Sequence, residues 1–228
     1  MNTRRSMSEI NRDINKDFIN ATVTKFDKAD KKSEELTQIP VYMEQLINLL
    51  DSYAGIEADS KDANGKQKHL LSQAMINSYR KEELIPKLDG KKYTSDHIML
   101  LLLISQLKNV LTINEIKQLF TSIFGNFQGD SIISIKECYD LFQQLLDIQY
   151  KDAGGDFEER FNKVIKSKTQ KIEDGKKQDL AEVFLTVMML VAEANVSKKL
   201  AETIIAEFLA APQINKTKPV KATKNKKS

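Results

Sequence analysis

The sequence contains few of the residues that break helices or cross-link a chain. Its 228 residues include one cysteine, Cys138, with eight glycines, four prolines and no tryptophan. A single thiol cannot form an intramolecular disulfide, so the fold needs no oxidising compartment and we expect a cytoplasmic protein. No proline lies between Pro86 and Pro212. This scarcity of turn-forming residues favours helices over a sheet, and we predict a fold that is all-α or nearly so.

Long apolar runs are also absent. The longest are residues 98–104 and 183–192, and both are shorter than the roughly 18 apolar residues that a membrane-spanning helix needs. The chain is nevertheless 41% hydrophobic, which is enough for a sizeable core. We therefore expect a soluble protein that does not bind a membrane.

Residues suited to metal binding or nucleophilic chemistry are few and scattered. The two histidines, His69 and His97, each lie at the start of a predicted helix, where surface or capping roles are expected. With the single Cys138 they cannot complete a tetrahedral zinc site. The aspartates around Gly154-Gly155 lack the spacing of a calcium loop, and no phosphate-binding glycine loop occurs. We predict a protein that is not an enzyme and that holds no cofactor or metal.

Positive charge is concentrated in two segments. Six lysines lie within residues 216–228, and without them the net charge of +3 becomes −3. A Lys-rich tail of low hydrophobicity is typical of a disordered segment. The second segment, 66–93, carries seven cations against three anions, whereas acidic residues prevail over 94–150. This basic segment is either a polyanion-binding surface or an ordinary solvated face of a Lys-rich protein.

Hydrophobic periodicity predicts a series of helices after a polar arm with a narrow apolar stripe at 1–35. The predicted helices cover residues 39–50, 72–83, 94–108, 112–124, 134–148, 156–167, 178–194 and 197–210. Pro40 suits the first turn of its helix, whereas Ser72 can cap the next helix and Pro86 stops it. Two helices begin with the capping-box pattern, in Thr112 with Glu115 and in Ser134 with Glu137.

Breaks in this series suggest the organisation of the chain. The segment 54–68 forms a long loop, the glycines within 125–129 mark a domain boundary, and Gly154-Gly155 interrupts a helix. We predict four parts, namely an N-terminal arm or helix (1–35), a first helical domain (36–124), a C-terminal helical domain (125–211) and a disordered tail (212–228).

The first helical domain has the layout of a winged helix-turn-helix module. Two short helices precede a basic loop behind Pro86, and two closely joined core helices follow. In such a module one helix enters the major groove of DNA and the wing contacts the backbone. The loop at 87–93 contains Asp89-Gly90, a dipeptide that favours tight turns. The layout predicts DNA contact through the helix at 72–83 and a basic wing at 87–93.

Several short motifs resemble known families. Met-Ile-Asn-Ser-Tyr at 75–79, Leu-Ile-Pro at 84–86 and Leu-Thr-Ile-Asn-Glu-Ile at 111–116 resemble the MerR-type DNA-binding domain. Residues 39 to about 145 resemble more closely the bacterial family called domain of unknown function 1836, which also has Ile-Pro before its first helix and Lys-Lys-Tyr in the loop. The resemblance implies a MerR-like winged helix-turn-helix fold and suggests a transcriptional regulator. The resemblance implies no enzymatic reaction.

The resemblance to MerR proteins also assigns individual positions. Tyr79 matches the second tyrosine of the recognition helix, Lys91 matches the wing arginine, and Tyr93 matches the tyrosine that closes the wing. Two positions depart from the pattern, because Asn77 replaces an arginine and Arg80 replaces an acidic residue.

Eight residues are the candidate DNA contacts: Gln73, Asn77, Tyr79, Arg80, Lys81, Lys91, Lys92 and Tyr93. We expect the lysines to bind phosphates, because lysine supplies charge without the planar fork of arginine. Gln73 and Asn77, four residues apart on one helical face, either read base edges or are solvent-facing amides. The two tyrosines either contact DNA or pack half-buried. The loop at 54–68, longer than the family's tight turn, could remodel or remove the DNA surface.

Two functions remain open. The first is a DNA-binding transcriptional regulator that binds double-stranded DNA as a homodimer, paired through the apolar stripes of its C-terminal helices. The same stripes could instead form an intramolecular helical bundle. The alternative is a MerR-like adaptor that does not bind DNA and acts through protein contacts.

Overall fold

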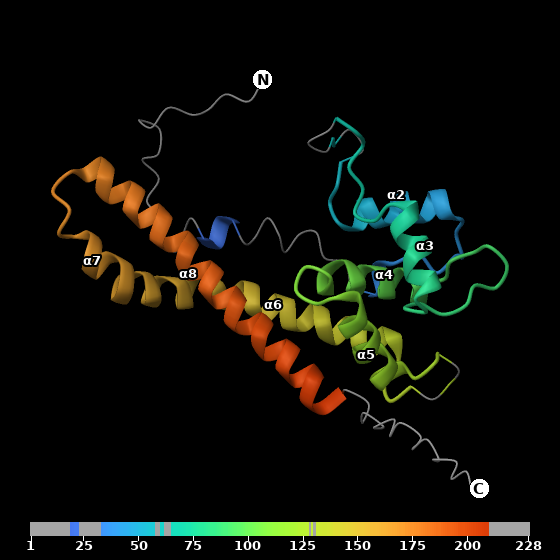
Figure 1. Cartoon of the computed structure of the whole chain (residues 1–228). Coiled ribbons are helices and arrows are strands. Elements are labelled where there is room, and N and C mark those ends of the chain that lie inside the picture. The colour runs from blue at the N-terminus through green and yellow to red at the C-terminus, as the bar shows by residue number, and fades with distance from the viewer. Residues whose placement is uncertain are drawn as a thin grey trace, which may run out of the picture.

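The computed structural model describes residues 19–22, 33–57, 60–61, 65–127, 129 and 131–209. Within these residues the chain is helical, with two isolated bridges and no strand, so the all-α prediction is confirmed. A head of short helices sits beside a long helical hairpin (Figure 1). The tail at 212–228 and most of the predicted apolar stripe within 1–35 lie outside the described residues.

The head consists of α2 (Met43–Tyr53), α3 (Gln73–Lys81), α4 (Ser95–Leu107) and α5 (Ile113–Phe124). Helix α4 is its centre, because nine of its thirteen residues are buried. The other three helices each bury one face in the same hydrophobic cluster, which we call the head cluster. Each large apolar side chain buried there contributes about 1.5–3 kcal/mol. The predicted core helix at 94–108 is confirmed.

Helix α2 begins later than its sequence pattern predicts. Pro40 was expected in its first turn, but Val41 is still extended and exchanges two backbone hydrogen bonds with Tyr93, at 2.9 and 2.8 Å. Because this antiparallel bridge requires extended backbone, the helix starts only after Tyr42. The bridge fastens the segment before α2 to the segment before α4.

Helix α3 is capped as predicted but ends before its proline. The Ser72 hydroxyl accepts a hydrogen bond from the backbone N–H of Met75, at 3.3 Å. At the other end Glu83 has a φ of +58°, the left-handed conformation that closes many helices. The N–H of Leu84 then donates to the Tyr79 carbonyl at 3.0 Å. The helix therefore stops at Lys81, and residues 82–92 form a separate loop.

The helix after the head is longer than predicted. Helix α6 (Ile135–Arg160) runs through Gly154-Gly155 without a break and continues as a π-helical segment, η3 (Phe161–Lys166). The predicted interruption is therefore wrong. Each glycine costs a helix roughly 1 kcal/mol, whereas burial of Phe157 and Phe161 just beyond the pair contributes more than that cost. Tertiary packing overrides the local propensity.

The hairpin returns as one continuous helix. After α7 (Ser167–Thr169) and a turn, α8 (Gly175–Ile204) runs into a second π-helical segment, η4 (Ile205–Leu209). The predicted division into helices at 178–194 and 197–210 is wrong as well. Neither glycine nor proline lies within 176–209. The segment therefore contains no residue that breaks a helix, and one continuous helix is favoured.

Helix α6 belongs to two hydrophobic clusters. Its Tyr139 is 1% exposed in the head cluster, which Ile205 of η4 also joins. The second, which we call the hairpin cluster, consists of Phe157, Phe161 and Ile165, with Ile19, Leu185 and Met189 packed against it. Because α6 packs on α4 across the break at 125–131, that break does not separate two hydrophobic cores.

Helix α8 leaves much of its apolar surface uncovered. By length and composition the helix Gly175–Leu209 is long and apolar enough to cross a membrane, with a mean hydropathy of 1.6 over an 18-residue window of which 6% is buried. We expected no such helix because only uninterrupted apolar runs were counted. The mean hydropathy over a longer window, which includes scattered polar residues, is high enough. Large apolar side chains are also exposed on α6, among them Leu141, Leu145 and Ile148.

Candidate functional site

One face of α3 is open to solvent. Gln73, Asn77 and Arg80 follow one another at spacings of four and three residues, so they lie on the same face of the helix. Gln73 and Arg80 are exposed and Asn77 is half-buried, while the opposite face packs into the head cluster. Lys81 is exposed beside them. The four polar side chains predicted to contact DNA from this helix are therefore accessible.

The two candidate tyrosines are core residues. Tyr79 is 5% exposed and Tyr93 is 1% exposed, and burial raises the pKa of the Tyr79 hydroxyl. The Tyr93 ring packs edge-on against the imidazole of His97, with ring centres 5.8 Å apart, and its buried hydroxyl has no hydrogen-bond partner among the described residues. The Tyr93 hydroxyl does not reach the surface, so we remove Tyr93 from the candidate DNA contacts. The Tyr79 ring packs in the head cluster.

The C-terminal end of α3 borders an open groove of about 840 Å³. Its walls are the last turn of α3, the 82–92 loop, and α5 with the residues that follow it. Cations from three elements line the groove against one carboxylate: Arg80, Lys81, Lys87 and Lys117 against Glu83. The formal charge of the lining is therefore +3. Such a concave, cationic surface attracts anions.

Lys117 is the groove residue that sequence reasoning missed. It belongs to α5, well outside the basic segment at 66–93, and only the fold brings it to α3. Its ammonium nitrogen lies 3.9 Å from a carboxylate oxygen of Glu83, and both side chains are exposed. Exposed ion pairs of this kind contribute about 0–1 kcal/mol. Lys117 therefore remains available to bind an anion.

The 82–92 loop is fixed to the head at two points. The Pro86 carbonyl oxygen lies 3.2 Å from Nε2 of His97, and Tyr93 is bridged to Val41. Nδ1 of the same imidazole accepts a hydrogen bond from the backbone N–H of Thr94, at 3.1 Å, and lies 2.7 Å from the Thr94 hydroxyl oxygen. His97 therefore caps α4, as predicted, and at the same time holds the loop.

Burial determines the protonation state of His97. The imidazole is 4% exposed, and desolvation lowers its pKa, with a smaller contribution of the same sign from Arg80. The Pro86 carbonyl and the Asp96 carboxylate oppose this shift. The ring is therefore neutral at neutral pH. Its proton lies on Nε2, where it faces Pro86, which leaves Nδ1 free to accept.

Lys91 and Lys92 form a separate cationic edge. Both side chains are exposed at the end of the 82–92 loop but do not line the groove. The Lys92 ammonium lies 5.4 Å from the centre of the Tyr42 ring, within the range of a cation–π interaction. The two ends of the loop do not pair with each other as in a β-hairpin. Tyr93, which follows the loop, pairs instead with Val41, which precedes α2.

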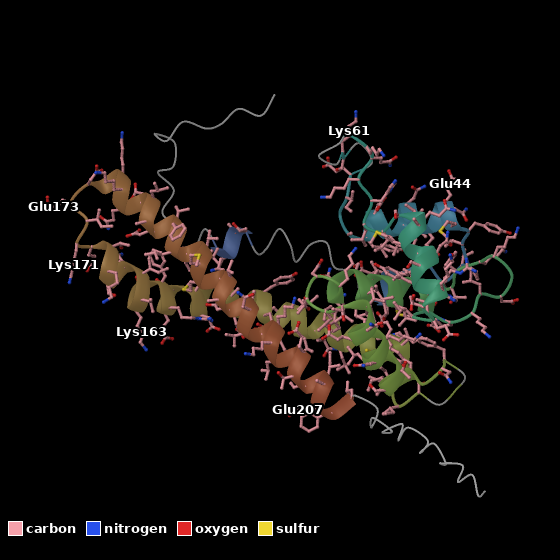
Figure 2. The ribbon with its side chains drawn as sticks, viewed as in Figure 1. Glu44, Lys61, Lys163, Lys171, Glu173 and Glu207 are labelled. Carbon is pink, nitrogen blue, oxygen red and sulfur yellow. The ribbon has the colours of Figure 1, made fainter. Side chains whose placement is uncertain are left out.

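The long loop at 54–68 leaves the groove open. None of its described residues, 54–57, 60–61 and 65–68, lines the groove, and the part that carries Lys61 projects away from the helices of the head (Figure 2). The end of the loop is held by Asp51, whose carboxylate lies 2.6 Å from Nδ1 of His69 and accepts a hydrogen bond from the N–H of Leu70 at 2.7 Å. The described part of this insertion therefore does not line the groove beside α3.

Other reactive groups do not converge in the described part of the chain. No group of three or more His, Cys, Asp or Glu side chains that could hold a metal occurs there. Cys138 is half-buried at the start of α6, and burial raises the pKa of its thiol. A thiol with a raised pKa is a poor nucleophile at neutral pH.

Comparison with known proteins finds one similarity, which covers the head. Residues 31–142 match the model of a family described as Domain of unknown function (DUF1836). No curated protein and no solved structure matches the chain. The matched segment contains α2 to α5, the groove and the first turns of α6, and it extends past the domain boundary predicted at residue 125. Residues 31–142 are therefore similar to the DUF1836 family, and this segment contains the Ile-Pro, Met-Ile-Asn-x-Tyr, Leu-Ile-Pro and Lys-Lys-Tyr motifs.

Proposed function

We propose that this protein is a DNA-binding transcriptional regulator whose head is a MerR-like winged helix-turn-helix domain. In this proposal α3 lies in the major groove and presents Gln73, Asn77 and Arg80 to base edges. The lysines of α3 and of the 82–92 loop bind phosphates, with the loop in the place of the wing. Lys117 adds a phosphate contact from α5.

The observation that carries the proposal is the meeting of cations from three elements in one groove beside an exposed helical face. The groove has a formal charge of +3, although the chain without its six C-terminal lysines has a net charge of −3. The cations are therefore concentrated in the groove, although the chain without those six lysines is net acidic. Lysines placed only for solubility would be spread over the surface, whereas a polyanion site requires this concentration.

The composition of the site indicates how binding would work. Most of its cations are lysines, so phosphate contact dominates affinity and weakens steeply as salt rises. Base selection depends on Gln73 and Asn77, because side-chain amides can bind adenine through two hydrogen bonds. Each such pair discriminates against a wrong base by about 1–3 kcal/mol.

The test is a charge reversal in the groove with a matched reversal elsewhere. The groove variant is Arg80→Glu with Lys117→Glu, and its control is Lys163→Glu with Lys171→Glu, two residues of the hairpin far from the head (Figure 2). Binding of the full-length proteins to a fluorescent mixed-sequence duplex is measured by anisotropy at several salt concentrations. We expect the groove variant to lose at least about tenfold in affinity and its salt slope to fall by about 2.

The control variant should bind like the unmodified protein. Equal losses in both variants would mean that only overall charge matters, which contradicts the proposal. A chain ending at Ala211 separates the groove from the lysine-rich tail, and abolished binding in that chain would contradict it as well. Selection from fragmented genomic DNA tests the regulatory part, because a regulator should recover discrete sites whereas a nonspecific binder should not.

A second candidate function is favoured by the exposed apolar surface of the hairpin. Leu141, Leu145 and Ile148 on α6 are 51–60% exposed, and apolar patches of this kind mark protein contacts. An adaptor that acts through such contacts needs no groove charge. Unchanged DNA binding in the groove variant, together with partner binding lost on substitution of these side chains, would favour the adaptor.

A further inference from the structure

Helix α8 carries an apolar stripe that is open to solvent. Its five members are 47–62% exposed, namely Leu180, Phe184, Val187, Met188 and Val191. Spacings of three and four residues place them on one face of the helix, and we call them the α8 stripe. No charged residue lies between Glu182 and Glu193. An exposed apolar surface of this kind marks a contact with another protein segment.

The N-terminal arm already reaches α8 at the level of the stripe. On the opposite face of α8, Leu185 and Met189 pack against the hairpin cluster, and Ile19 packs against the same cluster. Residues 19–22 are helical and lie beside α8 (Figure 1). Because these contacts share one cluster, Ile19 lies near the middle of the stretch 180–191. The chain segment that precedes Ile19 therefore ends next to the stripe.

The segment before Ile19 carries an apolar seam that matches the stripe in length. Met7, Ile10, Ile14 and Phe18 follow one another at spacings of three, four and four residues, and every residue between them is polar. This period predicts an amphipathic helix with one narrow apolar face. The segments 7–18 and 180–191 contain the same number of residues, and each spans about 16 Å as a helix.

Contacts farther along the arm set its direction. The Ser33 hydroxyl donates a hydrogen bond to the Asp140 carboxylate at 2.9 Å, which fixes the end of the arm to the early turns of α6 in the head. After Ile19 the chain therefore runs from the hairpin toward the head. A helix that continues back from residues 19–22 runs the other way, toward the turn at the tip of the hairpin, and is parallel to α8.

This direction fixes the register between the seam and the stripe. The two helices have the same rise of about 1.5 Å per residue, so equal steps from the level of Ile19 lead to equal positions on both. The resulting neighbours are Phe18 with Val187 and Met188, Ile14 with Phe184, and Ile10 with Leu180. Each seam residue except Met7 thus meets a member of the stripe.

A lipid surface fits the stripe less well than the arm does. Ile205 lies five whole turns after Val187 on α8 and so on the same side of the helix, and it is buried in the head cluster. The head therefore stands on the side that the stripe faces. A flat bilayer could not lie along the stripe without meeting the head, whereas a single helix fits beside it.

We propose that residues 7–18 form a helix that packs along the α8 stripe, parallel to α8, and adds a third helix to the hairpin. Another protein could then use the stripe only by displacing this arm. Both segments of the interface lie outside residues 31–142, which the family model matches. The inference goes beyond DNA binding and does not depend on it.

Tryptophan fluorescence of the full-length chain tests the contact, because the unmodified chain contains no tryptophan. The emission of Ile14→Trp should lie at shorter wavelength than that of Lys16→Trp, whose indole is on the polar side of the same helix. Adding Phe184→Glu should shift the Ile14→Trp emission to that of Lys16→Trp, because it puts a carboxylate against the indole. Adding Leu145→Glu instead, at a similarly exposed residue of α6, should leave the emission unchanged. Circular dichroism checks that the helices persist in each variant.

The register is tested by disulfide formation in a chain with Cys138→Ser. Ile10→Cys with Leu180→Cys should form a disulfide within one chain under mild oxidation, because the register brings the two positions together. Ile10→Cys with Val191→Cys is the matched control and should stay reduced, since position 191 lies about 16 Å farther along α8. Cross-linking of the control pair to the same extent, or in place of the first pair, would overturn the register.

Three other results would overturn the proposal. The first is the same emission from Ile14→Trp and Lys16→Trp. The second is an Ile14→Trp emission that reaches shorter wavelength only at high protein concentration, with disulfides that form only between chains, since this would assign the stripe to another copy. The third is such a shift only when vesicles of anionic phospholipid are added, which would assign the seam to a membrane. None of these results depends on the outcome of the DNA-binding test.

Discussion

Replacing His97 with glutamine should remove much of the loss of stability on acidification between pH 7 and pH 5. The neutral imidazole makes contacts that a protonated ring cannot keep, because Nδ1 accepts a hydrogen bond from Thr94. The ring is also buried, and it lies at the N-terminus of α4, where the helix dipole disfavours a positive charge. Protonation would therefore uncap α4 while Nε2 still faces the Pro86 carbonyl.

The sign and the size of the effect follow from linkage. Burial lowers the pKa of His97 in the folded protein below its ordinary value of about 6.5. The unfolded chain therefore binds more protons than the folded one as the pH falls through 6.5, and the free energy of unfolding decreases. One such group changes it by at most about 1.4 kcal/mol per pH unit. If the ring stayed neutral to pH 5, the loss from pH 7 would be about 2 kcal/mol.

Urea unfolding followed by circular dichroism, at pH 7 and at pH 5, measures this loss. Glutamine at position 97 can accept from the Thr94 N–H as in an ordinary capping box, but it carries no titratable group. We expect His97→Gln to be less stable than the unmodified chain at pH 7, by about 1 kcal/mol for the weakened contact with Pro86. Its loss of stability from pH 7 to pH 5 should be smaller by up to about 2 kcal/mol.

The comparison isolates His97, because His69 and the carboxylates are present in both proteins and their contributions cancel. The same decrease from pH 7 to pH 5 in the two proteins would refute the reasoning. That result would mean that the folded chain takes up a proton at His97 without penalty, and that the buried cap is not the acid-sensitive contact.

Three further predictions concern the fold of the head. Glu83→Gly should raise the free energy of unfolding by about 1 kcal/mol, because glycine adopts the +58° φ of this position without strain. Glu82→Gly, at a φ of −78°, should lower the free energy of unfolding. Urea titrations that rank the two variants in the opposite order would contradict this prediction. Thr112→Ala should cost about 1 kcal/mol through loss of the α5 capping box, and thermal unfolding unchanged within error would refute it. Leu101→Ala, at a fully buried site of α4, should lower the free energy of unfolding by about 2–5 kcal/mol. Leu145→Ala, on the surface of α6, should lower it by less than about 0.5 kcal/mol. Calorimetry of the two variants compares these losses.

The helices of the head were predictable because their signals are local. The caps at Ser72 and Thr112, like the cap of α6 at Ser134, consist of contacts within four residues, and all three are present. The run of apolar residues in α4 predicts burial on every side, and α4 is buried. Where a distant contact decides, sequence reasoning failed. The start of α2 depends on the bridge between Val41 and Tyr93, which no local pattern indicates.

The candidate site was predictable only in part for the same reason. The exposed face with Gln73, Asn77 and Arg80 follows from helical periodicity alone. The burial of Tyr79 could not be read from its position beside that face, because it depends on how α3 is rotated against the head cluster. Lys117 required the whole fold of the head, since its neighbours in the groove lie about 30 residues earlier in the chain.

The unbroken course of α6 limits how this chain can change in length. Tyr139 in the head cluster and Phe157 in the hairpin cluster belong to the same helix, and their separation corresponds to about five full turns at 3.6 residues per turn. The two aromatic rings are therefore in phase. Inserting or deleting one residue between them would rotate the hairpin by about 100° and shift it by about 1.5 Å relative to the head. Natural variants with a longer or shorter α6 should therefore differ by steps close to whole turns.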